Sequence, residues 1–96
     1  MKTREEITQI LRKITPRLQK EFKVKNIGIF GSFVHGEASE ESDVDLLVEF
    51  SGKIGWEFID LKNFLEDALG IKVDLVTKKA LKPQLRDAIL KEVVYV

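Results

Sequence analysis

The sequence predicts a small β-sheet covered by α-helices on one side, in a single domain that spans residues 1–96. Segments typical of strands and of helices alternate along the chain. Two acidic residues take alternate positions in one predicted strand, and a further acid lies within a later strand. For the three acids to lie close together, their strands must share one edge of the sheet, on a face that the helices do not cover. A chain of 96 residues is long enough for one such core.

The first 22 residues predict two helices. An amphipathic helix is expected over residues 3–14, because Thr3 and Glu6 fit a capping box and apolar residues recur at helical spacing. Thr15 as N-cap and Pro16 at the first helical position predict a second helix, in preference to one continuous kinked helix.

Strands and helices then alternate to the end of the chain. Glycines and prolines separate the periodic stretches. The predicted elements are a strand over 26–30, a short helix over 32–35 stopped at Gly36, a strand over 43–50, a helix from Phe58 to Leu69 closed by Gly70, a strand over 72–76, a loop over 77–82, a helix from Pro83, and an edge strand over 93–96.

The apolar side of each element gives the expected core. Phe33 is expected in the core or at an interface, and Trp56 and Phe58 are expected to be buried rather than to serve as exposed anchors for a partner. The remaining predicted core residues are Ile27, Ile29, Leu46, Val48, Leu61, Leu65, Val73, Leu75 and Ile89.

Composition excludes several classes of protein. Sixteen basic and sixteen acidic residues cancel, and a pI near 6.6 argues against direct binding of nucleic acid. No apolar stretch approaches the roughly 20 residues of a membrane span, so a cytoplasmic protein is expected. The sequence has no cysteine and one histidine, which excludes thiolate chemistry and histidine clusters. The length also excludes a template-dependent polymerase with separate fingers and thumb.

A glycine-serine turn follows the first predicted strand. The buried strand ends at Gly31 and Ser32, so the next backbone N–H groups are free to point at an anion. These two residues also suit an ordinary tight turn with a serine cap. In the functional interpretation, the backbone amides of this turn bind the distal phosphates of a nucleotide. Ser32 would add its hydroxyl, and Gly31 would permit close approach of the backbone to the phosphates.

Two aspartates follow in the next strand. Asp43 and Asp45 project to the same face because strand side chains alternate. Neighbouring carboxylates repel unless a cation joins them, and Mg²⁺ that carries nucleotide phosphates is bound by one or two carboxylates. The spacing therefore suggests phosphoryl or nucleotidyl transfer, although a turn cap and a solvated residue are the plain alternatives. Asp74, flanked by Val73 and Leu75, projects toward the polar face of its own strand.

The patterns G-S-x-x-x-G over 31–36 and S-D-x-D-h-h-V over 42–48 resemble the signature of polymerase-beta-type nucleotidyltransferases, and in this short form the minimal nucleotidyltransferase (MNT) antitoxins. The resemblance runs from about Val24 to the C-terminus. It implies an α+β fold with a mixed sheet, like the polymerase-beta palm. It also implies a third acid on a neighbouring strand, for which Asp74 is the candidate.

The resemblance also implies a mechanism. An acceptor hydroxyl attacks the α-phosphorus of a nucleoside triphosphate and pyrophosphate leaves. Two Mg²⁺ ions divide the work: one is bridged by Asp43 and Asp45, and the other involves Asp74, which can itself receive the proton. Gly31 and Ser32 hold the nucleotide, most simply ATP.

One departure from the family pattern concerns the turn. Related sequences commonly carry arginine at the place of His35, and sometimes at that of Phe33. A histidine of ordinary pKa is mostly neutral at pH 7, so a permanent phosphate-facing charge is replaced by a conditional one. His35 also fits a plain surface residue at the end of a short helix. Lys78, Lys79 and Lys82 form a basic cluster that suits a solvated loop, or attraction of phosphates or an acidic partner.

Two functions from different classes follow. The first is an Mg²⁺-dependent nucleotidyltransferase that transfers AMP from ATP to a hydroxyl of a protein, with a HEPN-type RNase toxin as the acceptor that the resemblance implies. The second is an antitoxin that neutralises such a toxin by binding alone, as part of a homo- or hetero-oligomer. Modification of a small molecule such as an aminoglycoside is disfavoured, because 96 residues leave little chain for an acceptor pocket.

Overall fold

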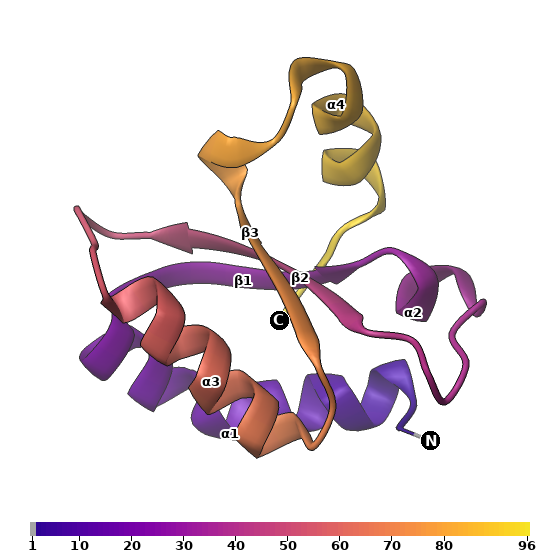
Figure 1. Ribbon diagram of the computed structural model, residues 1–96, viewed down its shortest axis with the longest axis horizontal. Helices are drawn as coiled ribbons and strands as arrows, with labels where there is room; N and C mark the ends of the chain where they lie inside the picture. The colour runs from indigo at the N-terminus through magenta and orange to yellow at the C-terminus, as the bar shows by residue number, and fades with distance from the viewer. Residues whose placement is uncertain (1) are drawn as a thin grey trace.

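The computed structural model describes residues 2–96 and contains one four-stranded mixed sheet with helices packed around it (Figure 1). The order of strands across the sheet is β3-β2-β1-β4. Strand β2 runs antiparallel to β1 and parallel to β3, and β4 adds an antiparallel edge to β1. The elements in chain order are α1 (Arg4–Phe22), β1 (Val24–Phe30), α2 (Ser32–His35), β2 (Val44–Phe50), α3 (Glu57–Leu69), β3 (Val73–Thr77), the 3₁₀ turn η1 (Lys78–Ala80), α4 (Pro83–Glu92) and β4 (Val94–Tyr95).

The α+β class and the mixed sheet are confirmed, but the helices do not all lie on one side. Helices α1 and α3 lie together under one face of the sheet, and α4 lies over the other (Figure 1). The second face is not purely polar, since Leu47 stands between Asp45 and Glu49 on it and is only 2% exposed. A buried leucine at that position requires cover, which explains a helix on this side as well.

Helix α1 is continuous through Pro16, so the preference for two separate helices is wrong. Ile7, Leu11 and Leu18 lie on one face of the whole helix and are fully buried. Burial of three large side chains offsets the cost of about 3 kcal/mol for an internal proline. Thr15, expected to cap a second helix, instead donates its hydroxyl to the carbonyl of Leu11 at 2.8 Å.

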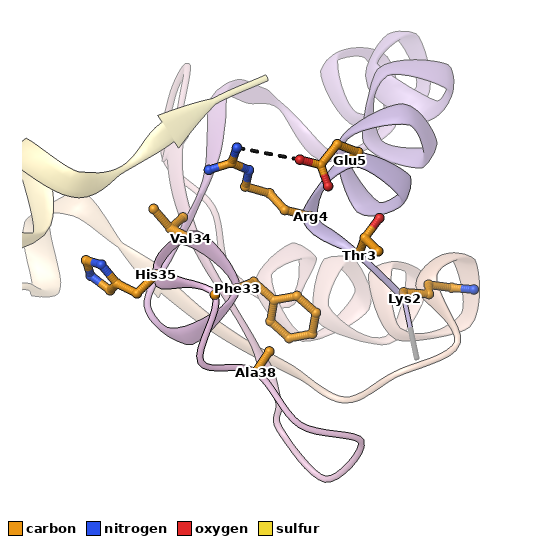
Figure 2. A pocket seen from close by; sticks show the side chains of 9 residues that line it. Lys2, Thr3, Arg4, Glu5, Phe33, Val34, His35 and Ala38 are labelled. Carbon is orange, nitrogen blue, oxygen red and sulfur yellow. Dashed lines mark ion pairs between the residues drawn. The ribbon is translucent and has the colours of Figure 1, made fainter.

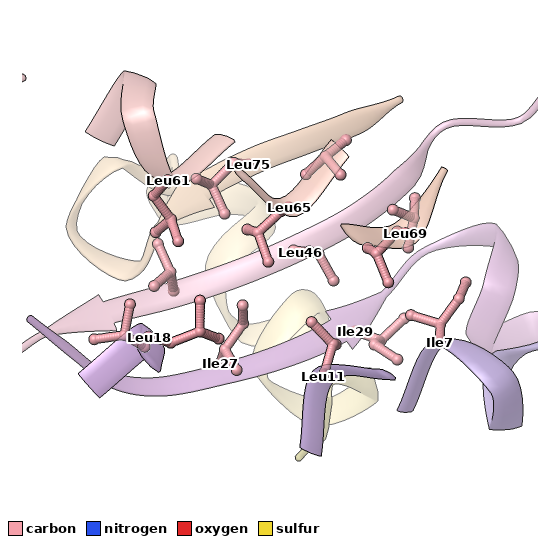
Figure 3. Packing of buried hydrophobic residues seen from close by; sticks show 14 of the residues in the cluster. Ile7, Leu11, Leu18, Ile27, Ile29, Leu46, Leu61, Leu65, Leu69 and Leu75 are labelled. Carbon is pink, nitrogen blue, oxygen red and sulfur yellow. The ribbon is translucent and has the colours of Figure 1, made fainter. Parts of the chain in front are cut away.

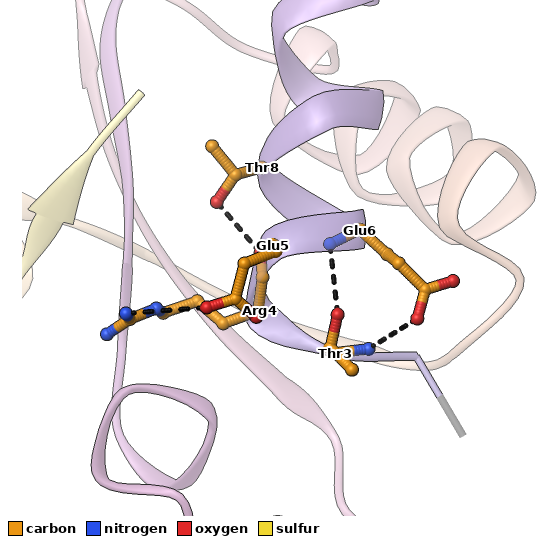
Figure 4. A network of polar contacts seen from close by, with 5 residues as sticks. All are labelled: Thr3, Arg4, Glu5, Glu6 and Thr8. Carbon is orange, nitrogen blue, oxygen red and sulfur yellow. Dashed lines mark hydrogen bonds and ion pairs between the residues drawn. The ribbon is translucent and has the colours of Figure 1, made fainter.

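The start of α1 has the predicted capping box (Figure 4). The hydroxyl of Thr3 accepts from the backbone N–H of Glu6 at 3.2 Å, and the Glu6 carboxylate accepts from the N–H of Thr3 at 3.1 Å. Thr8 donates to the carbonyl of Arg4 at 2.8 Å in the same turn. The two bonds between Thr3 and Glu6 satisfy N–H groups that the start of a helix leaves without partners, and the Thr8 bond satisfies that hydroxyl.

The core lies between the sheet and the pair α1 and α3 (Figure 3). Eight of the nine predicted core residues are buried there, and Phe33 joins them. Ile89 is the exception: it is half-buried and outside the cluster, because α4 contributes no buried residue. The prediction for Trp56 is also wrong, since its side chain is 80% exposed. Phe58 is half-buried and packs edge-on against Phe50, with ring centroids 6.5 Å apart.

The remaining boundaries agree closely with the predicted ones. Strand β1 begins two residues earlier than expected, beside a register shift between Val24 and Asn26. The short helix stops at Gly36 and α3 at Gly70, both in the left-handed conformation that favours glycine. The predicted loop over 77–82 contains η1. Within residues 2–96, no helix is long and apolar enough to cross a membrane.

Candidate active site

Two of the predicted acids stand side by side at one end of the sheet. Asp45 on β2 and Asp74 on β3 are register partners, and Phe30 at the end of β1 is the partner of Asp45 on the other side. Asp43 lies just before β2 and is exposed, so strand alternation does not fix its direction as predicted. Across the part of the chain that is described, no group of three or more acidic or histidine side chains is close enough to hold a metal ion.

The environment of Asp45 disfavours its ionised form. Partial burial and, after it, the neighbouring acids Asp74, Asp43 and Glu92 in that order together raise the pKa of Asp45 from its ordinary 3.8 to about 6. No lysine or arginine among residues 2–96 forms an ion pair with these four carboxyl groups. The site therefore concentrates negative charge with no lysine or arginine of residues 2–96 paired to it, and the basic group that contacts it is the His35 ring against Glu92.

This donor set fits a divalent cation. Carboxylate oxygens are the ligands that Mg²⁺ takes in proteins, usually from one or two carboxylates together with substrate oxygens. Asp45 and Asp74 supply such a pair, and Asp43 is near enough to raise the pKa of Asp45. A bound cation would offset both the cost of burying the Asp45 charge and its repulsion by the neighbouring acids, and so lower this pKa.

The glycine-serine turn lies directly beside Asp45. Gly31 has a φ of 77° and a ψ of −148°, a conformation that glycine alone adopts easily. A side chain at this position would collide with the Asp45 carboxylate. The group that comes close to Gly31 in this structure is the Asp45 carboxylate, and the approach of a phosphate to this turn stays a prediction.

A fourth acid, Glu92, lies at this site and was not predicted from the sequence. Glu92, the last residue of α4, accepts the backbone N–H of Gly31 at 3.1 Å through Oε1. Its Oε2 lies 2.5 Å from Nε2 of His35. His35 is thus paired with an acid as well as lying at the end of a short helix. The only sequence signal for Glu92 was its place just before the predicted edge strand, which brings it back beside β1.

A hollow of about 390 Å³ lies on the other side of α2, against the start of α1 (Figure 2). The Phe33 ring points toward Thr3 and Lys2, whereas the His35 ring is turned away (Figure 2). Among the described residues, its lining includes none of Asp43, Asp45 and Asp74. This hollow is therefore separate from the acid pair.

Comparison with known proteins identifies the class. The family described as nucleotidyltransferase domain matches residues 11–96, and the chain belongs to that family. The sequence is 48% identical to protein adenylyltransferase MntA of Thermococcus cleftensis over 97 residues, which cover 100% of this chain and 98% of the relative.

Solved structures agree with this assignment. One described as a minimal nucleotidyltransferase matches with a TM-score of 0.78 and 37% identity, covering 93% of this chain and 92% of the other. Another, a toxin-antitoxin with AMP-PNP, matches with a TM-score of 0.67 and 26% identity, covering 93% of this chain and 68% of that one. The chain is therefore a minimal nucleotidyltransferase in fold as well as in sequence.

Proposed function

We propose that this chain is an Mg²⁺-dependent protein adenylyltransferase that transfers AMP from ATP to a hydroxyl of a partner protein. The observation that carries the proposal is the pair Asp45 and Asp74, held in register beside the Gly31 turn in a member of the nucleotidyltransferase family. The 48% identity to a protein adenylyltransferase over the full chain supports AMP as the transferred group and a protein as the acceptor.

The partner we propose is a HEPN-type RNase toxin, with this chain as its antitoxin. The resemblance of residues 31–36 and 42–48 to MNT antitoxins implies this partner. The likeness to a toxin-antitoxin crystallised with AMP-PNP supports both a toxin partner and an adenine nucleotide at the site.

Each residue has a defined part in the reaction. The amides of Gly31 and Ser32 bind the distal phosphates, and Asp43, Asp45 and Asp74 hold Mg²⁺, which neutralises charge on the phosphates and lowers the pKa of the attacking hydroxyl when bound. The acceptor oxygen forms a bond to the α-phosphorus, and the bond from that phosphorus to the bridging oxygen of pyrophosphate breaks. Asp74 receives the proton of the hydroxyl. Because the protein contributes mainly position and charge, a small fold suffices.

The test is transfer of label from ATP that is radioactive at the α-phosphate. Purified protein, Mg²⁺ and the native cell lysate should yield a labelled protein band, and Asp45→Asn or Asp74→Asn should reduce the rate of labelling by about a hundredfold or more. Asp60→Asn is the matched control, because Asp60 is an exposed acid on α3, which lies on the opposite face.

Binding alone is the second candidate function. Glu92 already accepts the N–H of Gly31, so the turn can be held together without nucleotide. If no band is labelled and both asparagine variants still co-purify with the toxin and block its RNase activity, neutralisation by binding replaces transfer as the function.

A further inference from the structure

A second hollow, of about 600 Å³, lies at the opposite end of β2 and β3 from the acid pair. Its walls come from the end of β2, the loop before α3, the start of η1, and α4. Its volume is within the usual range for binding sites. No part of the proposed transfer reaction uses it.

Four cationic side chains line this hollow: Lys53, Lys78, Lys79 and Arg86. Within residues 2–96, none of them forms an ion pair with a carboxylate. The single acid in the lining is Glu49, which accepts a hydrogen bond from the Asn26 side chain at 2.9 Å. The chain as a whole has no net charge, so these cations form a local excess rather than part of a generally basic surface.

The lining of the hollow includes one β2 residue, Glu49, from the face of the sheet that carries the acid pair. Glu49 lies on the same face of β2 as Asp45, because the two positions are four residues apart on one strand. On the neighbouring strand β3, Thr77 follows Asp74 by three residues, a span of roughly 10 Å, and Lys78 comes directly after the strand as the first residue of η1. If an extended segment of the acceptor protein placed its reacting hydroxyl at Asp74, the residues about four positions along that segment from the hydroxyl would therefore lie at the hollow.

The lining favours carboxylates over nucleic acid. Its one aromatic residue, Phe50, is engaged edge-on with Phe58 and is not a free platform for a base. The pI near 6.6 also lies below the range of nucleic-acid-binding surfaces. Three lysines and an arginine spread over several elements suit separate carboxylates along a peptide, and the side chains of Phe50 and Ile54 add apolar walls.

We propose that this hollow docks an acidic segment of the acceptor protein, so that the hydroxyl chosen for transfer is one with carboxylates about four residues away. This inference rests on the proposed function, since it specifies which hydroxyl of the acceptor protein the active site would modify. Lys79 and Arg86 are its best test positions, because both are exposed and neither belongs to the core.

The experiment measures fluorescence anisotropy of a labelled peptide with one tyrosine and three glutamates at about that spacing on each side. The full chain should bind it, and Lys79→Glu/Arg86→Glu should weaken binding by about tenfold or more. Lys13→Glu/Lys62→Glu is the control with the same change of charge, placed on exposed positions of α1 and α3. The control should bind within about twofold of wild type.

Three results would overturn the docking site: no binding by the wild-type chain, equal binding of a peptide with glutamines in place of glutamates, or equal losses in both double variants. Tighter binding of an adenosine trinucleotide than of the acidic peptide would also overturn it, because the ligand would then be nucleic acid. Label transfer from ATP is measured on the same preparations. A wild-type chain that binds the peptide but never transfers label refutes the proposed function, whereas transfer without preference for the peptide refutes only the docking site.

Discussion

The two faces of the sheet differ in how tightly they are packed. Toward α1 and α3, Val44, Leu46 and Val48 of β2 are fully buried in a continuous apolar cluster. Toward α4, Asp45 on the same strand is only partly covered, and the covering helix has no buried residue of its own. One face therefore supplies most of the stability, and the other carries the acids, so substitutions on the two faces should separate stability from activity.

The largest expected effect is loss of stability on the packed face. Leu46→Ala should lower the free energy of unfolding by about 2–5 kcal/mol, because it removes a fully buried side chain and leaves a cavity. Leu85→Ala on α4 is the matched control and should change stability by less than about 0.5 kcal/mol, since that leucine is 52% exposed. Urea denaturation followed by circular dichroism measures both. Equal losses would mean that α4 is part of the core.

A smaller loss is expected at the point where the turn meets the acids. Gly31→Ala should destabilise the protein by about 1–3 kcal/mol, because alanine is strained at this φ and its methyl group collides with the Asp45 carboxylate. Gly52→Ala is the control, since a side chain there meets no atom. Thermal unfolding compares the two variants, and similar melting temperatures would contradict the turn geometry.

Asp45→Asn should make the metal-free protein more stable. The pKa of Asp45 is raised from 3.8 to about 6, so the folded form holds the proton more tightly than the unfolded form. The contribution of protonated Asp45 to the free energy of unfolding is fully present below pH 3.8 and is lost as the pH rises through about 6. At pH 7 the substitution should add about 1 kcal/mol, a figure already reduced for solvent screening.

Unfolding in EDTA across this pH range measures the gain. The wild-type and asparagine proteins should have similar stability below about pH 3.8, diverge as the pH rises from 3.8 to about 6, and keep a constant difference above that. Added Mg²⁺ should stabilise the wild-type protein and narrow the difference. A variant that is less stable than wild type in EDTA would show that the acids are not held in repulsion.

The smallest effect is expected at the contact that joins α4 to the turn. Glu92→Ala removes hydrogen bonds to Gly31 and His35 at a partly exposed position and should cost about 1 kcal/mol or less. Hydrogen exchange should rise in residues 83–96 while exchange in β2 stays unchanged. A rise in β2 as well would show that α4 supports the sheet itself.

The sequence was sufficient where local chemistry and periodicity agree. The capping box of Thr3, the glycine stops of α2 and α3, and the buried strand faces were all predicted from short-range patterns. The pairing of Asp45 with Asp74 joins two strands that are distant in sequence. It was expected only because the family pattern calls for a third acid on a neighbouring strand.

Prediction failed where distant packing decides. Pro16 stays inside α1 because the long apolar face of this helix is buried against the sheet and α3. Rules based on the residues next to a proline do not include that burial. Ile89 was expected in the core from helical spacing, but α4 has no second layer to bury it. Glu92 and the basic hollow depend on where α4 crosses the sheet, and that path is set by the connection between the two edge strands.

The contact between Glu92 and the N–H of Gly31 has a consequence for how tightly nucleotide binds. One N–H serves one strong acceptor, so in the proposed reaction a phosphate oxygen and the Glu92 carboxylate compete for it. The chain thus contains its own competitor, tethered by the short strand β4 to the edge of β1. Any partner that draws β4 away would tighten ATP binding without touching the nucleotide. Calorimetric titration of Glu92→Ala with ATP should accordingly give a lower Kd than wild type, and an unchanged or higher Kd would show that the carboxylate is no competitor.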